Sequence, residues 1–273
     1  MKLELAGLAL DAISVGGIET CIGLPGLGLS FDLGRTPDSA VGRATVLFTH
    51  AHMDHMGGVA WHCATRALRG MAPPTYVLGP EDAPAFADLL AVWQRLDRSA
   101  MPHQQVLIGP GDSWALSPQW QVRPFRAPHV VPCQGYALWH QKKKLRPEFQ
   151  GLPGPEIERL RRTGVAVTQV VEAAEVAFCG DTRIEVVERE EVVRRARLLI
   201  LECTFVDDEV TVAEARSMGH VHLYEIAERA ALFHNEVVLL THFSPRFRRE
   251  RILAALDQRL PAELRRRVVP LLL

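Results

Sequence analysis

The stretch that decides the fold reads THAHMDHMGG and covers Thr49 to Gly58. It places three histidines and one aspartate within six residues, directly after the apolar run 44–48. Bunched histidines add little to a hydrophobic core and would repel one another if they were protonated. Imidazole nitrogen and carboxylate oxygen are ligands that zinc and similar metals prefer in proteins. The spacing therefore predicts a metal site at the end of a strand.

The order of residues in this stretch predicts two metal positions. His50 and His52 alternate as the chain leaves a strand, so both can face one metal. Asp54 and His55 follow around the next turn and can face a second metal. The two glycines that come next allow the backbone to turn tightly into a helix. A loop of this composition without a metal is the alternative, and the spacing argues against it.

Two metals need more ligands than these four side chains. Three further candidates, His129, Asp181 and His242, each come just after a β-rich run. Taken singly, each is more typical of a turn aspartate or a capping histidine. Their repeated position at strand ends, together with the first motif, favours a shared site.

The composition fits an enzyme-sized globular protein without an overall attraction to nucleic acid. The 273 residues are 48% hydrophobic, and the formal net charge is -1, so any polyanion site must be a local basic patch. The five cysteines are scattered and form no CxxC pair, which argues against a disulfide framework and favours the reducing cytoplasm. The N-terminal segment makes a poor signal peptide, and no apolar run is long enough for a membrane helix.

Short β-rich runs bounded by Gly, Pro, Asp or Asn alternate with segments of helical periodicity. Strands are expected at 18–22, 27–32, 45–49, 75–78, 105–108, 121–126, 137–139, 176–179, 198–202 and 237–241. Helices are expected at 58–69, 80–96, 185–196, 223–234 and 248–260. Strands dominate the first half of the chain, and helices follow strands near its end. This mixture predicts two sheets packed face to face with helices outside, an α/β fold of the αββα sandwich type.

One segment, residues 140–164, breaks this pattern. It reads HQKKKLRPEFQGLPGPEIERLRRTG, is basic, contains Pro and Gly, and lacks a long apolar stripe. We interpret it as a protruding loop or arm. An ordinary solvated loop is the alternative.

Taken in order, six segments resemble the tRNase Z family of the metallo-β-lactamase superfamily, and within it the short plant-type form. They are THAHMDH, APHVVPCQGY, FCGDT, LILECTF, GHVHLYEIAERA and LLTHFSPRF. The first alone would indicate only the superfamily, whereas the others support the narrower family. The resemblance runs nearly end to end. It implies a single metallo-β-lactamase-fold domain over residues 1–273, with residues 140–164 as an inserted, short basic arm.

The same resemblance implies a complete ligand set for two zinc ions, with manganese or another divalent metal as alternatives. The ligands of one ion would be His50, His52 and His129, those of the other Asp54, His55 and His242, with Asp181 as the bridge. Hydroxide generated from water at the two metals would attack the phosphodiester. Asp54 could also orient that hydroxide as a base.

The leaving group needs a proton, and the resemblance implies that Glu202 in LECT and His220 in GHVH supply it. A carboxylate that orients an imidazole raises its pKa and keeps it protonated as an acid. His222 lies two residues further on and is interpreted as a capping or packing residue. Asp32 resembles an aspartate that braces the metal loop. The histidines not expected to bind metal are His62, His103, His140 and His234.

The resemblance also gives the basic arm a role, because it corresponds to the part of the family that grips the body of tRNA. Contacts to backbone phosphate carry affinity without sequence information. The arm residues implied to make them are Lys142, Lys143, Lys144, Arg146, Arg159, Arg161 and Arg162. Arg183 and Arg246 lie next to expected ligands and could form two hydrogen bonds to phosphate oxygens, with surface salt bridges as the alternative.

These features together predict a zinc-dependent endoribonuclease that removes 3′ trailers from precursor tRNA and leaves a 3′-hydroxyl on the tRNA. One alternative is a hydrolase of the same fold that acts on a small ester, thioester or phosphodiester without an RNA substrate. Another is a metal-bound RNA-binding protein with weak catalysis. The resemblance further implies a homodimer, and we expect a cytoplasmic protein without a membrane partner.

Overall fold

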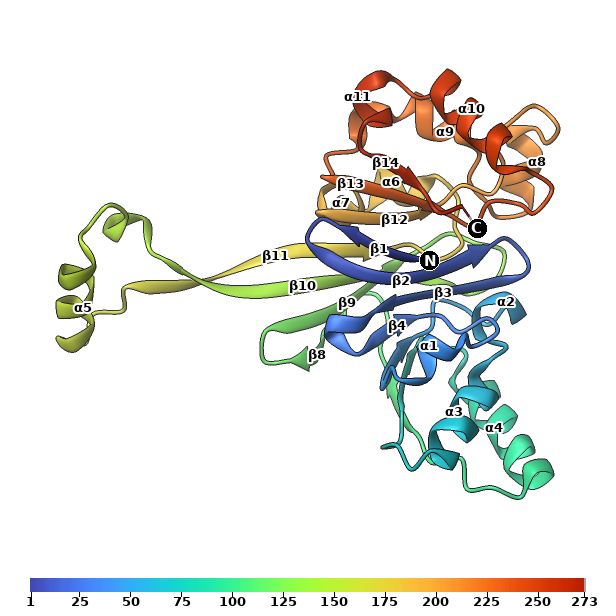
Figure 1. Cartoon of the computed structure of the whole chain (residues 1–273), viewed down its shortest axis with the longest axis horizontal. Helices are drawn as coiled ribbons and strands as arrows, with labels where there is room; N and C mark the ends of the chain where they lie inside the picture. Colours follow the sequence, from blue (N-terminus) through green and yellow to red (C-terminus); the bar gives the residue numbers. More distant parts are fainter. Residues whose placement is uncertain (273) are drawn as a thin grey trace.

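The computed structural model describes residues 1–272 and shows two sheets packed face to face, with helices covering both outer faces (Figure 1). Each sheet has seven strands, and the strands follow one another in sequence order across each sheet. The αββα sandwich expected from the sequence is confirmed. No helix among residues 1–272 is both long and apolar enough to cross a lipid bilayer.

The first sheet is built from the N-terminal part of the chain. Its strands are β1 (Lys2–Leu5), β2 (Leu8–Val15), β3 (Glu19–Leu24), β4 (Leu29–Phe31), β5 (Thr45–Leu47), β6 (Thr75–Leu78) and β7 (Gln104–Leu107). β1 to β4 pair antiparallel and β4 to β7 pair parallel. β1 and β2 were not among the expected strands, although β2 alternates in burial along its length as a half-buried strand does.

The second sheet repeats this plan with the rest of the chain. Its strands are β8 (Trp114–Ser117), β9 (Trp120–Arg126), β10 (Gln134–Leu145), β11 (Thr168–Phe178), β12 (Leu198–Glu202), β13 (Val237–Thr241) and β14 (Val268–Pro270). β8 to β11 pair antiparallel and β11 to β14 pair parallel. Both sheets therefore change from antiparallel to parallel pairing part-way across, and the parallel part directs several strand ends to one edge.

Helices form the two outer layers. Those of the first sheet are α1 (Asp38–Val41), α2 (Met53–Met56), α3 (Val59–Leu68) and α4 (Ala83–Asp97). Those of the second sheet are α6 (Glu185–Arg189), α7 (Glu191–Arg195), α8 (Val212–Ser217), α9 (Leu223–Glu228), α10 (Arg249–Arg259) and α11 (Ala262–Arg265). The helix expected at 185–196 is divided at Glu190, whose backbone is extended.

Three hydrophobic layers hold the sandwich together. The central one lies between the sheets, where Phe31 of β4 meets Phe178 of β11 with ring centroids 4.8 Å apart. A second layer packs the first sheet against α3 and α4, and a third packs the second sheet against the C-terminal helices. The sheets are thus buried on both faces near their centres, and polar side chains there need internal partners.

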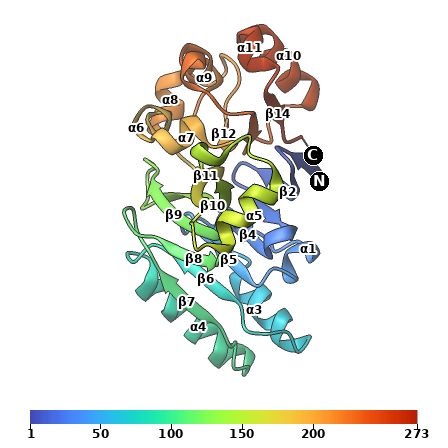
Figure 2. The ribbon, with the colours of Figure 1, turned by 90° about the vertical axis from the view of Figure 1, so that its left-hand side faces the viewer.

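The arm is a two-stranded ribbon that extends from the sandwich and ends in a helix (Figures 1 and 2). β10 and β11 remain paired outward to Leu145 and Thr168, and α5 (Gly154–Arg162) lies between them. The expected range 140–164 covers one strand and the helix but leaves out the returning strand, which starts at Thr168. The returning strand lacks an apolar stripe because no layer covers the ribbon.

Candidate metal centre

The predicted metal ligands lie together at one edge of the two sheets. His50, His52, Asp54 and His55 follow β5, and His242 follows β13, so both groups stand at the ends of parallel strands. Asp181 follows β11, and His129 comes from the loop after β9. The ends of strands in such sheets are where binding groups converge, because loops there lie side by side.

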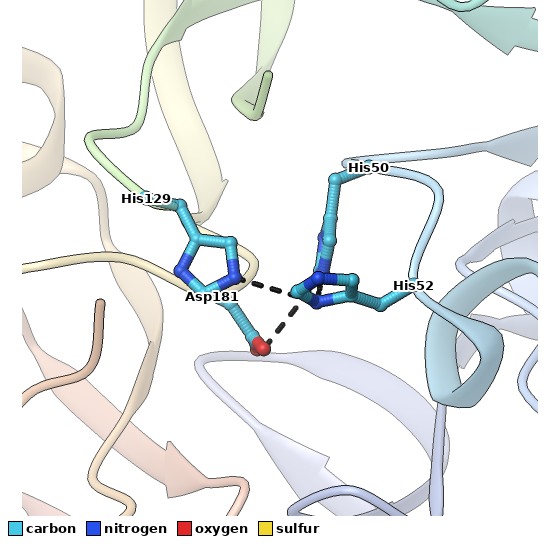
Figure 3. Close-up of side chains that lie close together, drawn as sticks. All are labelled: His50, His52, His129 and Asp181. Atoms are coloured by element: carbon cyan, nitrogen blue, oxygen red, sulfur yellow. Dashed lines mark hydrogen bonds and ion pairs between the residues drawn. The ribbon is translucent and has the colours of Figure 1, made fainter. Parts of the chain in front are cut away.

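Four of these side chains form a first group. His50, His52, His129 and Asp181 each offer one ligand atom, and these atoms all lie within 4.8 Å of one another (Figure 3). Nδ1 of His52 is 3.0 Å from Nε2 of His50 and 3.4 Å from Nε2 of His129. Nitrogen atoms from three rings thus converge on a single point.

A second group lies beside the first. Asp54, His55 and His242 bring their ligand atoms within the same 4.8 Å limit. Oδ1 of Asp181 is 3.2 Å from Nε2 of His55 and 3.4 Å from Nε2 of His242, while its Oδ2 is 3.8 Å from Nε2 of His50. The two oxygens of Asp181 therefore face different groups.

Hydrogen bonds to the outer ring nitrogens determine which nitrogen of each histidine carries the lone pair. Nδ1 of His55 lies 2.8 Å from Oδ2 of Asp32, and Nδ1 of His129 lies 2.9 Å from the carbonyl oxygen of Gly219. Each acceptor requires a proton on Nδ1, which leaves Nε2 free to bind a metal.

Threonine hydroxyls act in the same way at two further rings, those of His50 and His242. The Thr49 hydroxyl donates to Asp32 and accepts from Nδ1 of His50 at 3.0 Å. The Thr204 hydroxyl donates to Glu202 at 2.6 Å and accepts from Nδ1 of His242 at 3.0 Å. Both rings thus present an unprotonated Nε2 to the cluster.

The backbone around the cluster is unusual. Asp32 and His242 have φ angles of 55° and 61°, in the left-handed region that side chains other than glycine seldom adopt. Gly180 and Gly219 also have positive φ, and a Cβ at these positions would lie 2.7 Å from Cβ of Thr49 and 2.6 Å from Nδ1 of His129. Close packing therefore requires glycine at both positions.

The cluster has the properties of a site for a divalent metal. Oδ1 of Asp181 is buried and has no hydrogen-bond partner among the described residues. Burial alone would raise the pKa of Asp181, but the facing His242 and His55 outweigh it and hold that pKa well below its usual value. An ionised carboxylate that faces several imidazole rings, whose nitrogens offer lone pairs once they lose their protons, is a donor set that divalent metals of the zinc type favour.

Next to the cluster, Glu202 and His220 form a second polar pair. Oε1 of Glu202 accepts from Nδ1 of His220 at 2.9 Å and from the amide of Thr182 at 2.9 Å. Glu202 is 1% exposed, whereas the His220 side chain is 17% exposed and so can meet a substrate. Burial lowers the pKa of His220, but the adjacent Glu202 carboxylate outweighs this and raises it to about 9.

The remaining histidines lie outside the two groups that contain the predicted ligands. His222 caps the N-terminus of α9, where its ring accepts from the amide of Tyr224 at 3.1 Å, the capping role expected. His62 pairs with the hydroxyl of Tyr76 at 2.9 Å, and the ring of His140 stacks on Trp120 with centroids 4.4 Å apart.

The two arginines beside the cluster make different contacts. Nε of Arg183 donates to the carbonyl oxygen of Arg216 at 2.8 Å, which leaves the end of its guanidinium free. Arg246 is exposed, donates to the Ser244 hydroxyl at 3.1 Å, and lies 5.6 Å from the ring centre of Phe205. Neither has a carboxylate within ion-pair distance among residues 1–272.

Some residues of the site were not predicted. Thr49 and Thr204 hold ligand rings, and the amide of Gly17 donates to Oδ2 of Asp54 at 2.9 Å. The two threonines stand inside the quoted motifs THAHMDH and LECTF, which was the available signal. Gly17 comes from the turn after β2, and nothing in its local sequence indicates a partner.

Comparison with known proteins agrees with this geometry. Residues 27–243 match the model of the beta-lactamase superfamily domain. The chain is 37% identical over 271 residues to tRNase Z TRZ1 of Arabidopsis thaliana, covering 98% of this chain and 96% of that protein. The chain belongs to the tRNase Z family.

Other tRNase Z proteins extend this result. The chloroplastic tRNase Z TRZ2 of Arabidopsis thaliana is 35% identical, with 98% of this chain and 76% of that protein covered. The short form of human tRNase Z has the same fold, with a TM-score of 0.60 at 19% identity over 87% of this chain and 93% of the human one. Membership of the tRNase Z family, inferred from the motifs, is confirmed, and the small-substrate hydrolase is not favoured.

Proposed function

We propose that this protein is an endoribonuclease that cuts precursor tRNA at its 3′ side and releases the trailer. The observation that carries the proposal is the Glu202–His220 pair beside a seven-residue metal centre, because a phosphodiesterase of this type needs a proton donor for the leaving oxygen. Relatives named tRNase Z support the choice of RNA as substrate.

The seven ligands named from the sequence fit two zinc ions, with Asp181 shared, and manganese or another divalent metal is the alternative. When bound, such ions lower the pKa of a water molecule and neutralise charge on the phosphate under attack. The side chains supply the rest. Asp54, whose Oδ2 accepts a hydrogen bond from the amide of Gly17, would accept the proton of the attacking water.

His220 would supply the proton that the leaving 3′ oxygen needs. Glu202 fixes Nδ1–H of the ring, so Nε2–H remains to donate to the 3′ oxygen of the tRNA. The bond from water oxygen to phosphorus forms as the bond to the 3′ oxygen breaks. The products are a tRNA with a 3′-hydroxyl and a trailer with a 5′-phosphate.

RNA binding is assigned to two places. Arg183 and Arg246, beside the centre, would contact phosphates next to the cut. The basic residues of the arm would hold the tRNA body, and α5 supports this because it buries none of its residues and ends in Arg159, Arg161 and Arg162.

We further propose that the protein is a homodimer of the cytoplasm. Met53 and Trp61 are 78% and 65% exposed, and Leu89 and Trp93 of α4 help to line a hollow of about 250 Å³ between α2, α3 and α4. An apolar face of this kind is typical of subunit contacts. The five unpaired cysteines support a reducing compartment. Sedimentation of wild type and Trp61→Glu tests the dimer, and an unchanged mass would contradict it.

The deciding experiment is incubation of the zinc-loaded protein with a 3′-extended tRNA, followed by mapping of both ends. We expect one cut, with a 3′-hydroxyl on the tRNA fragment. The matched control is a tRNA of the same sequence without a trailer. Turnover of a small thioester or phosphodiester with no cut in the extended tRNA would favour the alternative hydrolase, and tight RNA binding without turnover would favour the binding protein.

A further inference from the structure

One buried carboxylate lies where the arm leaves the body. Glu175 is the extra residue at a bulge in the β10–β11 ladder, which shifts register between Leu138 and Trp139. The ribbon loses its neighbours within a few residues of this point, because β9 pairs with β10 only as far as His140 and β12 pairs with β11 only from Val176 onward. Glu175 therefore marks the root of the arm.

The carboxylate of Glu175 connects arm and body through charged partners. Its Oε1 accepts from Nζ of Lys142, in the arm, at 2.6 Å, and its Oε2 accepts from Arg197, just before β12, at 2.7 Å. Arg197 also makes two hydrogen bonds to Glu236, just before β13, at 2.8 and 2.9 Å. The chain Lys142–Glu175–Arg197–Glu236 thus crosses four neighbouring strands.

The carboxylate at the root is more deeply buried than the acid in the Arg162–Glu158 ion pair of α5. The Glu175 side chain is 4% exposed, and its partners Lys142 and Arg197 are 41% and 39% exposed. Arg162 and Glu158 of α5, by contrast, form a pair that is 80% and 54% exposed. Burial would raise the pKa of Glu175, but Lys142 and Arg197 outweigh it and hold that pKa below its usual value. Exposed pairs contribute little to stability, whereas a buried carboxylate needs charged or hydrogen-bonding partners to offset its loss of hydration.

A small change at the root produces a large change at the tip. The ribbon from Glu175 to Thr168 is about 23 Å long at roughly 3.3 Å per residue, so a tilt of about 20° would move its end by about 8 Å. A misplacement of even about 1 Å can reduce catalysis severely. RNA held at the tip reaches the metal centre correctly only if the root is rigid.

We propose that Glu175 is a positioning residue that holds the arm in the direction from which bound RNA presents its 3′ junction to the metal centre. This inference rests on the proposed function. Lys142, which was expected to contact RNA, serves the root instead, because its ammonium group is occupied by Glu175. Lys143 and Lys144 are exposed and remain available for phosphate.

Glu175→Gln tests the role, since it preserves size and removes the charge that both cations need. If the arm then occupies the competent direction about one-tenth of the time, KM for extended tRNA rises about tenfold. Hydrolysis of a small phosphodiester stays unchanged. The slope of log KM against log salt should not fall, because every arm residue that bound a phosphate is still present.

Glu158→Gln is the matched control, because it adds the same positive charge to the arm without touching the root. It should leave KM equal or slightly lower. If charge alone mattered, both variants would lower KM, and that result for Glu175→Gln would overturn the proposal. Arg197→Lys keeps the positive charge but cannot make all the hydrogen bonds of Arg197 to Glu175 and Glu236. It should therefore also raise KM.

A distance measurement keeps the test independent of activity. Spin labels on Gln150→Cys, at the arm tip, and Gln258→Cys, on α10, report the arm direction in a Cys133→Ser background whose other thiols are buried. The distance distribution should broaden in Glu175→Gln, and an unchanged distribution would overturn the proposal. If wild type fails to cut extended tRNA, the proposed function fails, while this measurement still decides the role of Glu175.

Discussion

The metal centre and the arm hold their polar groups in opposite ways. At the centre, the rings of His50, His55 and His242 are buried, and their outer nitrogens are bonded to an acceptor such as Asp32 or Thr204. On α5, charged side chains are exposed and pair only with their neighbours in the helix. Chemistry at one phosphate needs atoms at fixed positions, whereas binding along a phosphate backbone needs mainly charge density.

The largest effect should come from Asp181→Ala, which breaks the centre. We expect loss of bound metal and a fall in kcat/KM of about 10³-fold or more, since the metals contribute several kcal/mol to the transition state and each 1.4 kcal/mol is tenfold. Elemental analysis and cleavage of extended tRNA measure both. Asp88→Ala, exposed on α4, is the control. Full activity of Asp181→Ala would contradict the shared-ligand assignment.

The next effect, from His220→Ala, separates proton donation from metal binding. Metal content should stay near wild type while kcat falls by about 10²–10⁴-fold, the usual contribution of a general acid. His222→Ala should leave kcat nearly unchanged and lower the free energy of unfolding by about 1 kcal/mol, because it removes a helix cap. A greater loss of kcat in His222→Ala would reverse the roles of these two histidines.

Asp181 could be predicted from the sequence pattern because it follows an apolar run, whereas His220 was predicted through the resemblance of its GHVH motif to the family. The partners of the ligands were harder to find. Thr204 lies 38 residues from the ring that it holds, and Gly17 lies 37 residues from Asp54. Only the folded sandwich brings these pairs together.

The fold likewise has parts that could be predicted from local sequence and parts that could not. Buried parallel strands such as β12 and β13 are continuous apolar runs and could be predicted from the sequence. The returning strand of the arm was missed because the ribbon packs on no layer. Neither of its faces is buried, so its sequence does not need the alternation of apolar and polar residues that indicates a strand. Glu175 carried no signal, since its role depends on a bulge and on Arg197 from another strand.

A smaller effect should come from shortening the arm beyond the root. Replacement of residues 146–167 by a short Gly/Ser turn keeps Lys142 and Glu175. KM for extended tRNA should rise about tenfold, and the salt slope should fall by about 0.7–0.9 for each phosphate that the arm no longer binds. Metal content and hydrolysis of a small phosphodiester measure the centre. Equal losses on both substrates would show that the arm supports the fold instead.

The smallest effect compares two adjacent lysines. Lys143→Met should reduce the salt slope by about 0.7–0.9, the value for one bound phosphate. Lys142→Met removes the same charge but should leave the slope unchanged, because Lys142 binds Glu175. Cleavage rates at several salt concentrations measure both. Equal slopes in the two variants would place Lys142 back among the residues that bind RNA.

The distance in sequence between the ligands has a consequence for the time at which the enzyme becomes active. Asp54 and His242 are 188 residues apart, and the amide of His242 donates to the hydroxyl of Ser14, 228 residues before it. During synthesis, the first strands leave the ribosome long before β13. The centre can be completed only after β13 has emerged, so a nascent chain that stops before His242 exposes the HxHxDH motif without this ligand. Cleavage that depends on both groups of ligands therefore cannot begin before His242 has been added and β13 has folded.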